Sequence, residues 1–265
     1  MKKKGIALVE RQYLFPFVLI TSLFFLWGFA HAILDVLNKH FQELLTITRT
    51  HSAMIQATMY MGYFIMAIPA GLFINRHGYR KGVVLGLLLY GIGSLLFIPG
   101  QYIASFNMFL FSLFVIGCGL TFLETAANPY VTELGARETA ASRLNFAQSF
   151  NGLGCIFAPI LTGLLLFSDE DKGASGNVAL PYAVMGVIVL LAALAFMRVR
   201  LPEIPHEEEV DSEGHRVGLW AHKLFVFGLV ALFAYEVSEI SINSFFINYV
   251  TEVGWMNARD ASLVL

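Results

Sequence analysis

Two acidic residues stand inside long apolar runs of this sequence. Asp35 lies toward the end of the first run, one helical turn after His31, and Glu124 lies deep in a run that begins at Phe109. A carboxyl group kept out of water favours its protonated form and releases the proton when water enters. Both acids are therefore candidates for binding and releasing protons. Two structural alternatives stay open: Asp35 could reach surface water, and Glu124 could tie two helices together.

Amide and phenol side chains recur at helical spacing around these acids. Residues three or four positions apart share one helix face, and such groups suit a neutral polyol such as a sugar, which needs many hydrogen-bond partners but no countercharge. Taken singly, each is equally explained as a hydrogen bond between helices. As converging stripes they predict a polar cavity, to which we assign His31, Gln56, Tyr60, Glu124, Asn128, Asn145, Gln148, Asn151, Glu239 and Asn243.

A short segment from Gly71 to Lys81 combines glycine with positive charge. Gly71 permits a close helix approach and Gly78 a tight turn, while the cations can pair with carboxylates or with helix C-termini. The alternative is a turn whose charges serve only membrane topology. The segment predicts a breakable latch formed by Gly71, Asn75, Arg76, Gly78, Arg80 and Lys81.

The composition places these residues in lipid. Of 265 residues, 57% are hydrophobic and only 14% are charged, whereas soluble domains carry about 25% charged residues. The net charge of -2 leaves no basic surface for nucleic acid. The two cysteines lie in apolar runs, and no metal-ligand or nucleophile motif occurs. We therefore expect a membrane protein that is not an enzyme and holds neither cofactor nor metal.

The apolar runs have the length of membrane-spanning helices, about 20 residues each. None alternates in the manner of a barrel strand, so the fold class is an all-α polytopic membrane protein. Seven complete spans are expected, and an eighth begins near Ala258; the seven fall at 13–39, 52–74, 81–100, 107–131, 143–167, 180–198 and 221–250.

The positive charges predict the orientation of these spans. Most of the 17 Lys and Arg residues fall in one alternating set of segments, which holds the N-terminus, the 75–80 loop and residues 199–220. Cations stay on the cytoplasmic face during insertion, so the acidic loop 169–171 should face outside. The basic start and Ala30-His31-Ala32 imitate a cleavable signal peptide. The apolar stretch continues past that site, however, which argues against cleavage.

The domain organisation follows from one long polar interruption after the sixth span. Residues 1–198 form a six-helix transmembrane bundle, 199–220 a cytoplasmic linker, and 221–265 the first helix of a second bundle with the start of the next. Many secondary transporters are built from six-helix halves around a site at the membrane midplane. The sequence is therefore expected to be C-terminally incomplete.

Several motifs resemble a known family. Gly71–Lys81 resembles the signature loop of the major facilitator superfamily, with Asn75 where an aspartate is usual. Within that superfamily, three strings are similar to the fucose–galactose–glucose proton symporters: Phe24-Phe-Leu-Trp-Gly28 followed by Asp35, Phe122-Leu-Glu-Thr-Ala-Ala-Asn-Pro-Tyr130, and Arg143-Leu-Asn-Phe-Ala-Gln-Ser-Phe-Asn151.

The resemblance implies roles for single residues. It matches Asp35 to the family's protonated aspartate, Glu124 to its sugar-linked glutamate, and Gln148 and Asn151 to polar positions of the sugar cavity. Glu239 resembles a glutamate of the glucose/galactose branch. The fucose branch is Asn-rich before the aspartate, whereas this chain reads His31-Ala-Ile-Leu34. That difference favours glucose, galactose or another hexose such as N-acetylglucosamine over L-fucose.

These observations predict a proton-coupled hexose symporter that works by alternating access. It would lie in a bacterial cytoplasmic membrane with its N-terminus in the cytoplasm, and it would be a monomer when full length. Its partners would be a small sugar, H+ and the lipid bilayer. The alternatives are a shortened, non-transporting membrane sugar sensor or scaffold, and an L-fucose symporter.

Overall fold

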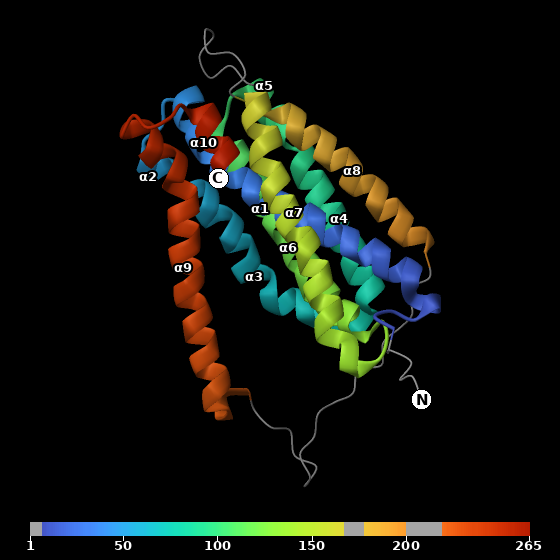
Figure 1. Ribbon diagram of the computed structural model, residues 1–265. Helices are drawn as coiled ribbons and strands as arrows, with labels where there is room; N and C mark the ends of the chain where they lie inside the picture. The colour runs from blue at the N-terminus through green and yellow to red at the C-terminus, as the bar shows by residue number, and fades with distance from the viewer. Residues whose placement is uncertain (1–6, 167–177, 200–218) are drawn as a thin grey trace.

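The computed structural model describes residues 7–166, 178–199 and 219–265, and the regular structure in these ranges is helical (Figure 1). Single 3₁₀ turns occur at Arg11–Tyr13, Arg137–Thr139 and Leu219–Ala221. The helices are α1 Leu14–Leu44, α2 Arg49–Ser52, α3 Met54–His77, α4 Tyr79–Leu95, α5 Phe97–Ile103, α6 Phe106–Glu133, α7 Ala140–Leu166, α8 Ala179–Arg198, α9 Lys223–Glu252 and α10 Ala258–Val264.

Seven stretches of the described residues are long and apolar enough to cross a bilayer, which confirms the expected all-α, multi-span class. The third span, expected as one helix over 81–100, is instead interrupted at Leu96, where α4 ends and α5 begins. Pro99 explains the break, because it has no N–H to donate to the carbonyl one turn earlier, at Leu95. The short helix α2 was not expected from the hydropathy pattern.

The first six spans pack as one bundle. α1 packs mainly on α7, α4 lies against both α6 and α8, and α3 lies against α6. Small residues allow the backbones of α1 and α7 to approach closely. A methyl group on Gly28 would overlap the carbonyl oxygen of Asn151, and one on Gly154 would overlap that of Phe25. This crossing brings Asn151 of α7 directly against α1.

A buried arginine ties the turn between α6 and α7 to the start of the chain. Arg143 is fully buried and donates to backbone carbonyls and one hydroxyl. Because unsatisfied carbonyls gather at a helix C-terminus, a cation is well placed there. The guanidinium of Arg143 donates to Val131 O at 3.0 Å, Leu8 O and Ala136 O at 3.1 Å, Thr139 Oγ1 at 2.7 Å, and Thr132 O.

Helix α9 meets the bundle at one end only. Its buried side chains all lie in its last third: Ser244, Ile247, Asn248 and Val250. Figure 1 shows this part of α9 beside α2 and α10, at what we call the α2 end of the molecule, and the Lys223 end away from the other helices. α10 in turn packs on α7. Contact between the first six spans and α9 is therefore concentrated at the α2 end.

Two expected segments fall in undescribed parts of the chain. The acidic loop 169–171 lies outside the described residues, as does the expected linker 199–220 apart from its two edges. The division into a bundle, a linker and a second bundle therefore stays a prediction.

Candidate functional site

The carboxylate of Asp35 is shared by three helices. This half-buried α1 side chain accepts through Oδ1 from Gln56 Nε2 on α3 at 2.9 Å and from Ser244 Oγ on α9 at 3.3 Å. Glu239, also on α9, lies within electrostatic reach of it. Asp35 thus stands where the six-helix bundle meets α9, although its role in proton transfer stays a prediction.

His31, one turn before Asp35, belongs to a chain of aromatic hydrogen bonds between α1 and α3. Tyr63 Oη accepts from Trp27 Nε1 at 3.0 Å and lies 2.8 Å from His31 Nε2, while Tyr60 Oη lies 3.4 Å from His31 Nδ1. A neutral imidazole with its proton on Nδ1 can accept from Tyr63 and donate toward Tyr60. The two predicted residues His31 and Tyr60 are therefore brought together, through geometry that also recruits Trp27 and Tyr63.

Glu124 and Asn128 present unused hydrogen-bonding capacity on α6. The half-buried Glu124 side chain is within electrostatic reach of Tyr63, and of Glu236 on α9, but makes no hydrogen bond to another described residue. One turn on, the buried Oδ1 atom of Asn128 also has no partner among the described residues. A polar atom buried without a partner is costly, so this pair is suited to receiving hydroxyl groups from outside the chain.

The predicted polar residues of α7, Asn145, Gln148 and Asn151, differ in their burial and in their partners. Asn151 donates from Nδ2 to the Phe24 carbonyl of α1 at 3.3 Å, which is a contact between helices. Gln148 is half-buried and Asn145 is exposed. On α9, Asn243 is half-buried and Glu239 is exposed. The structure therefore brings Asp35, Gln56, His31, Tyr60 and Glu239 near one another, while Asn145 is exposed and makes none of these contacts.

The predicted latch segment contains one clear bridge between helices. Arg80 donates from Nε to Phe196 O at 3.1 Å and from Nη2 to Met197 O, at the C-terminal end of α8. Gly78 adopts a φ of 86°, the left-handed region that favours glycine, between α3 and α4. The prediction that Gly71 permits a close helix approach is wrong, because a methyl group at Gly71 would meet nothing within 4 Å among the described atoms.

The other latch residues, Asn75, Arg76 and Lys81, are exposed at the surface. A latch function of the segment stays a prediction.

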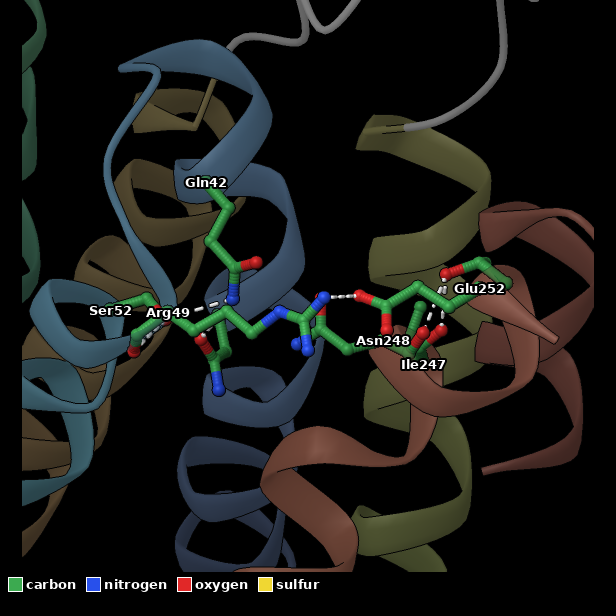
Figure 2. A network of polar contacts seen from close by, with 8 residues as sticks. Gln42, Arg49, Ser52, Ile247, Asn248 and Glu252 are labelled. Carbon is green, nitrogen blue, oxygen red and sulfur yellow. Dashed lines mark hydrogen bonds and ion pairs between the residues drawn. The ribbon is translucent and has the colours of Figure 1, made fainter.

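A second polar network joins α1 and α2 to α9 and was not predicted. Figure 2 shows Arg49 of α2 reaching across to Glu252 at the end of α9, with which it forms an ion pair. Gln42 donates to Asn38 Oδ1 at 3.0 Å and to Ser52 Oγ at 2.8 Å. Helical spacing could have placed Asn38 on the same face of α1 as Asp35. It could not predict contacts between residues more than 200 positions apart, such as Arg49 with Glu252.

A surface hollow elsewhere holds none of the predicted residues. It has a volume of about 430 Å³ and lies between α5 and α8, where it is lined by Ile98, Gln101, Tyr102, Ala179, Leu180 and Ala183. The candidate site therefore rests on the polar groups around Asp35 and Glu124 rather than on this hollow.

Comparisons with known proteins agree on one family. Residues 17–265 match the profile of the Major Facilitator Superfamily. A glucose/galactose transporter of Brucella abortus biovar 1 (strain 9-941) is 35% identical over 96% of this chain and 63% of its own length. The L-fucose-proton symporter of Escherichia coli (strain K12) is 34% identical over 96% of this chain and 64% of its own.

Solved structures point the same way. The crystal structure of a variant of the E. coli fucose:proton symporter FucP matches with a TM-score of 0.68 and 32% identity, over 91% of this chain and 64% of that one. The chain thus spans somewhat less than two thirds of the length of these relatives. With seven apolar spans among its described residues and the packing described above, the chain belongs to the major facilitator superfamily.

Proposed function

We propose that this protein is a proton-coupled hexose symporter that works by alternating access in a bacterial cytoplasmic membrane, with its N-terminus in the cytoplasm. The relatives named as glucose/galactose transporters and L-fucose-proton symporters support a sugar and a proton as the cargo. The whole transporter's activity is part of the proposal, because the chain spans 63% of the first of these relatives.

One observation carries the proposal: Asp35 holds donors from α3 and from α9 at the same carboxylate oxygen. In transporters built from two bundles, access alternates as one bundle rocks against the other around a central site. A titrating acid at the contact between them can link its charge to that motion. Neutralising Asp35 lowers the cost of closing protein around it, so the proton-loaded form reorients more readily.

The sugar would bind beside polar groups that find no partner among the described residues. Glu124 and Asn128 of α6 would accept from its hydroxyl groups, together with Gln148 of α7, and Tyr60 would supply an aromatic face. Asn151, Asn145, Asn243 and Glu239 complete the proposed set at its edges. Each proton that moves inward releases about 2.3 kcal/mol of free energy per 100 mV of membrane potential. This free energy is enough to drive substantial accumulation of sugar.

The direct test is Asp35→Asn in proteoliposomes that hold a proton gradient. Uphill sugar uptake should disappear, while exchange of internal for external sugar persists, because the neutral amide mimics the loaded form. Asp260→Asn, at an exposed acid of α10, is the matched control and should leave uptake unchanged. Persistent accumulation in Asp35→Asn would refute the coupling role. Sugar binding without any transport by the parent chain would favour a non-transporting sensor.

A further inference from the structure

Ser244 of α9 is held by α1 at two points. Its backbone carbonyl accepts from Asn38 Nδ2 at 2.6 Å, and its hydroxyl donates to Asp35 Oδ1 at 3.3 Å. Ser244 is 4% exposed, and Asp35 and Asn38 lie three positions apart on one face of α1. A single residue of α9 therefore touches both the candidate proton site and a fixed anchor beside it.

These contacts mark the beginning of the seam between α1 and α9. Before Ser244 the side chains of α9 are largely exposed, and after it the helix is seated against the bundle as far as the Arg49–Glu252 ion pair (Figure 2). Asp35 lies at the point where this seam opens. Any separation of α9 from α1 must break the hydroxyl contact with Asp35, and any seating must form it.

We propose that Ser244 is a positioning residue that couples protonation of Asp35 to the seating of α9 on α1. Seating exchanges the water around the carboxylate for one hydroxyl group, which is incomplete compensation for a charge. It also brings the like charge of Glu239 within electrostatic reach. The charged form of Asp35 therefore opposes seating, the neutral form permits it, and the Ser244 hydroxyl determines how strong the opposition is. This inference rests on the proposed role of Asp35 as the proton site.

The groups that face Asp35 come from four helices. Its own helix supplies His31, α3 supplies Gln56 and Tyr60, α7 supplies Cys155, and α9 supplies Glu239 and Ser244. Among the described residues, Ser244 is the α9 side chain that hydrogen-bonds to Asp35. Removing its hydroxyl leaves the other facing groups in place, so the effect of this one contact can be isolated.

The seating of α9 can be measured without sugar or transport. Spin labels on cysteines at the exposed positions His51 and Val253, on α2 and just beyond α9, report the distance across the seam by double electron–electron resonance. The full chain is placed in lipid nanodiscs between pH 5 and 9. Cys118 and Cys155 are replaced by alanine in the parent and in every variant alike, so that each variant differs from its parent only at the tested residue. The seated fraction should rise as the pH falls, and in Asp35→Asn it should be high at every pH.

Ser244→Ala should lower the ratio of seated to unseated chains about tenfold at pH 9, where Asp35 is charged, and much less at pH 5, where it is neutral. One hydrogen bond to a charged group can supply a change of about tenfold. Ser241→Ala is the matched control, because within the described part of the chain that exposed serine donates to Val237 O of its own helix and not to α1. Asn38→Ala, which removes the anchor but not the hydroxyl, should lower this ratio by the same factor at pH 5 and at pH 9.

Two results would overturn the coupling: a ratio of seated to unseated chains at pH 9 in Ser244→Ala equal to that in Ser241→Ala, or a seated fraction that does not depend on pH in the parent chain. Failure of the proposed function is distinguishable. If Asp35→Asn still accumulates sugar while Ser244→Ala lowers the ratio at pH 9, the symport proposal fails and the coupling stands.

Discussion

Replacing Tyr63 with phenylalanine should destabilise the contact between α1 and α3 by a calculable amount. The change deletes the hydroxyl oxygen that accepts from Trp27 Nε1 at 3.0 Å and lies 2.8 Å from His31 Nε2. Hydrogen bonds between membrane helices contribute about 0.6 kcal/mol on average and about 1.7 at most. Losing two of them should lower the free energy of unfolding by about 1.2 kcal/mol, with an upper bound near 3.4 kcal/mol.

Tyr60→Phe is the matched comparison for this prediction. It removes a single contact of 3.4 Å to His31 Nδ1, so its cost should stay below about 0.6 kcal/mol. Both variants can be measured by titrating the purified protein from detergent micelles into dodecyl sulfate while helix content is followed by circular dichroism. The expected difference of at least about 0.6 kcal/mol is a factor of about three in the unfolding equilibrium. Equal stabilities for the two variants would refute the hydrogen-bond chain described here.

Three further changes test the packing. Gly154→Ala, whose methyl group would overlap an α1 carbonyl, should cost about 1–3 kcal/mol of unfolding free energy. The control Gly152→Ala places its methyl group in open space and should cost nothing. Equal melting temperatures for the two variants would contradict the close crossing of α1 and α7. Arg143→Met leaves several carbonyls unpaired and should lower stability by more than about 3 kcal/mol in the same titration; a smaller loss would mean that water replaces the guanidinium. Reversing the charge of Arg49 or Glu252 alone should cost at most about 1 kcal/mol of unfolding free energy, because the pair is exposed. Reversing both charges should restore stability. Salt near 1 M screens the pair, so these differences should disappear there.

The spans could be predicted because lipid imposes a simple requirement. A helix must remain apolar for about 20 residues to cross the bilayer, and this pattern located all seven spans within a few residues. The break at Leu96 and the short helix α2 escaped the same reasoning. They depend on a single missing N–H at Pro99 and on local turn geometry, which a hydropathy average does not register.

The spacing of the sequence could group candidate residues within each helix, but it could not place one helix against another. Helical spacing correctly grouped His31 with Asp35, and Gln56 with Tyr60, since such pairs share a face. The contact of Ser244 with Asp35 depends on how α9 lies against α1, and one sequence carries no measure of that angle. For the same reason nothing indicated that Asn151 donates to a carbonyl of α1.

The buried Arg143 has a consequence for the order in which the chain is assembled. It donates to the carbonyl of Leu8, 135 positions earlier in the sequence. At about 5–20 residues per second, the ribosome needs roughly 7–27 s to travel that distance. The segment around Leu8 therefore lacks this hydrogen bond while four spans enter the lipid. It can form only when Arg143, at the start of the fifth span, has been made. Newly made chains should be open to proteases near Leu8 during that interval and resistant after it.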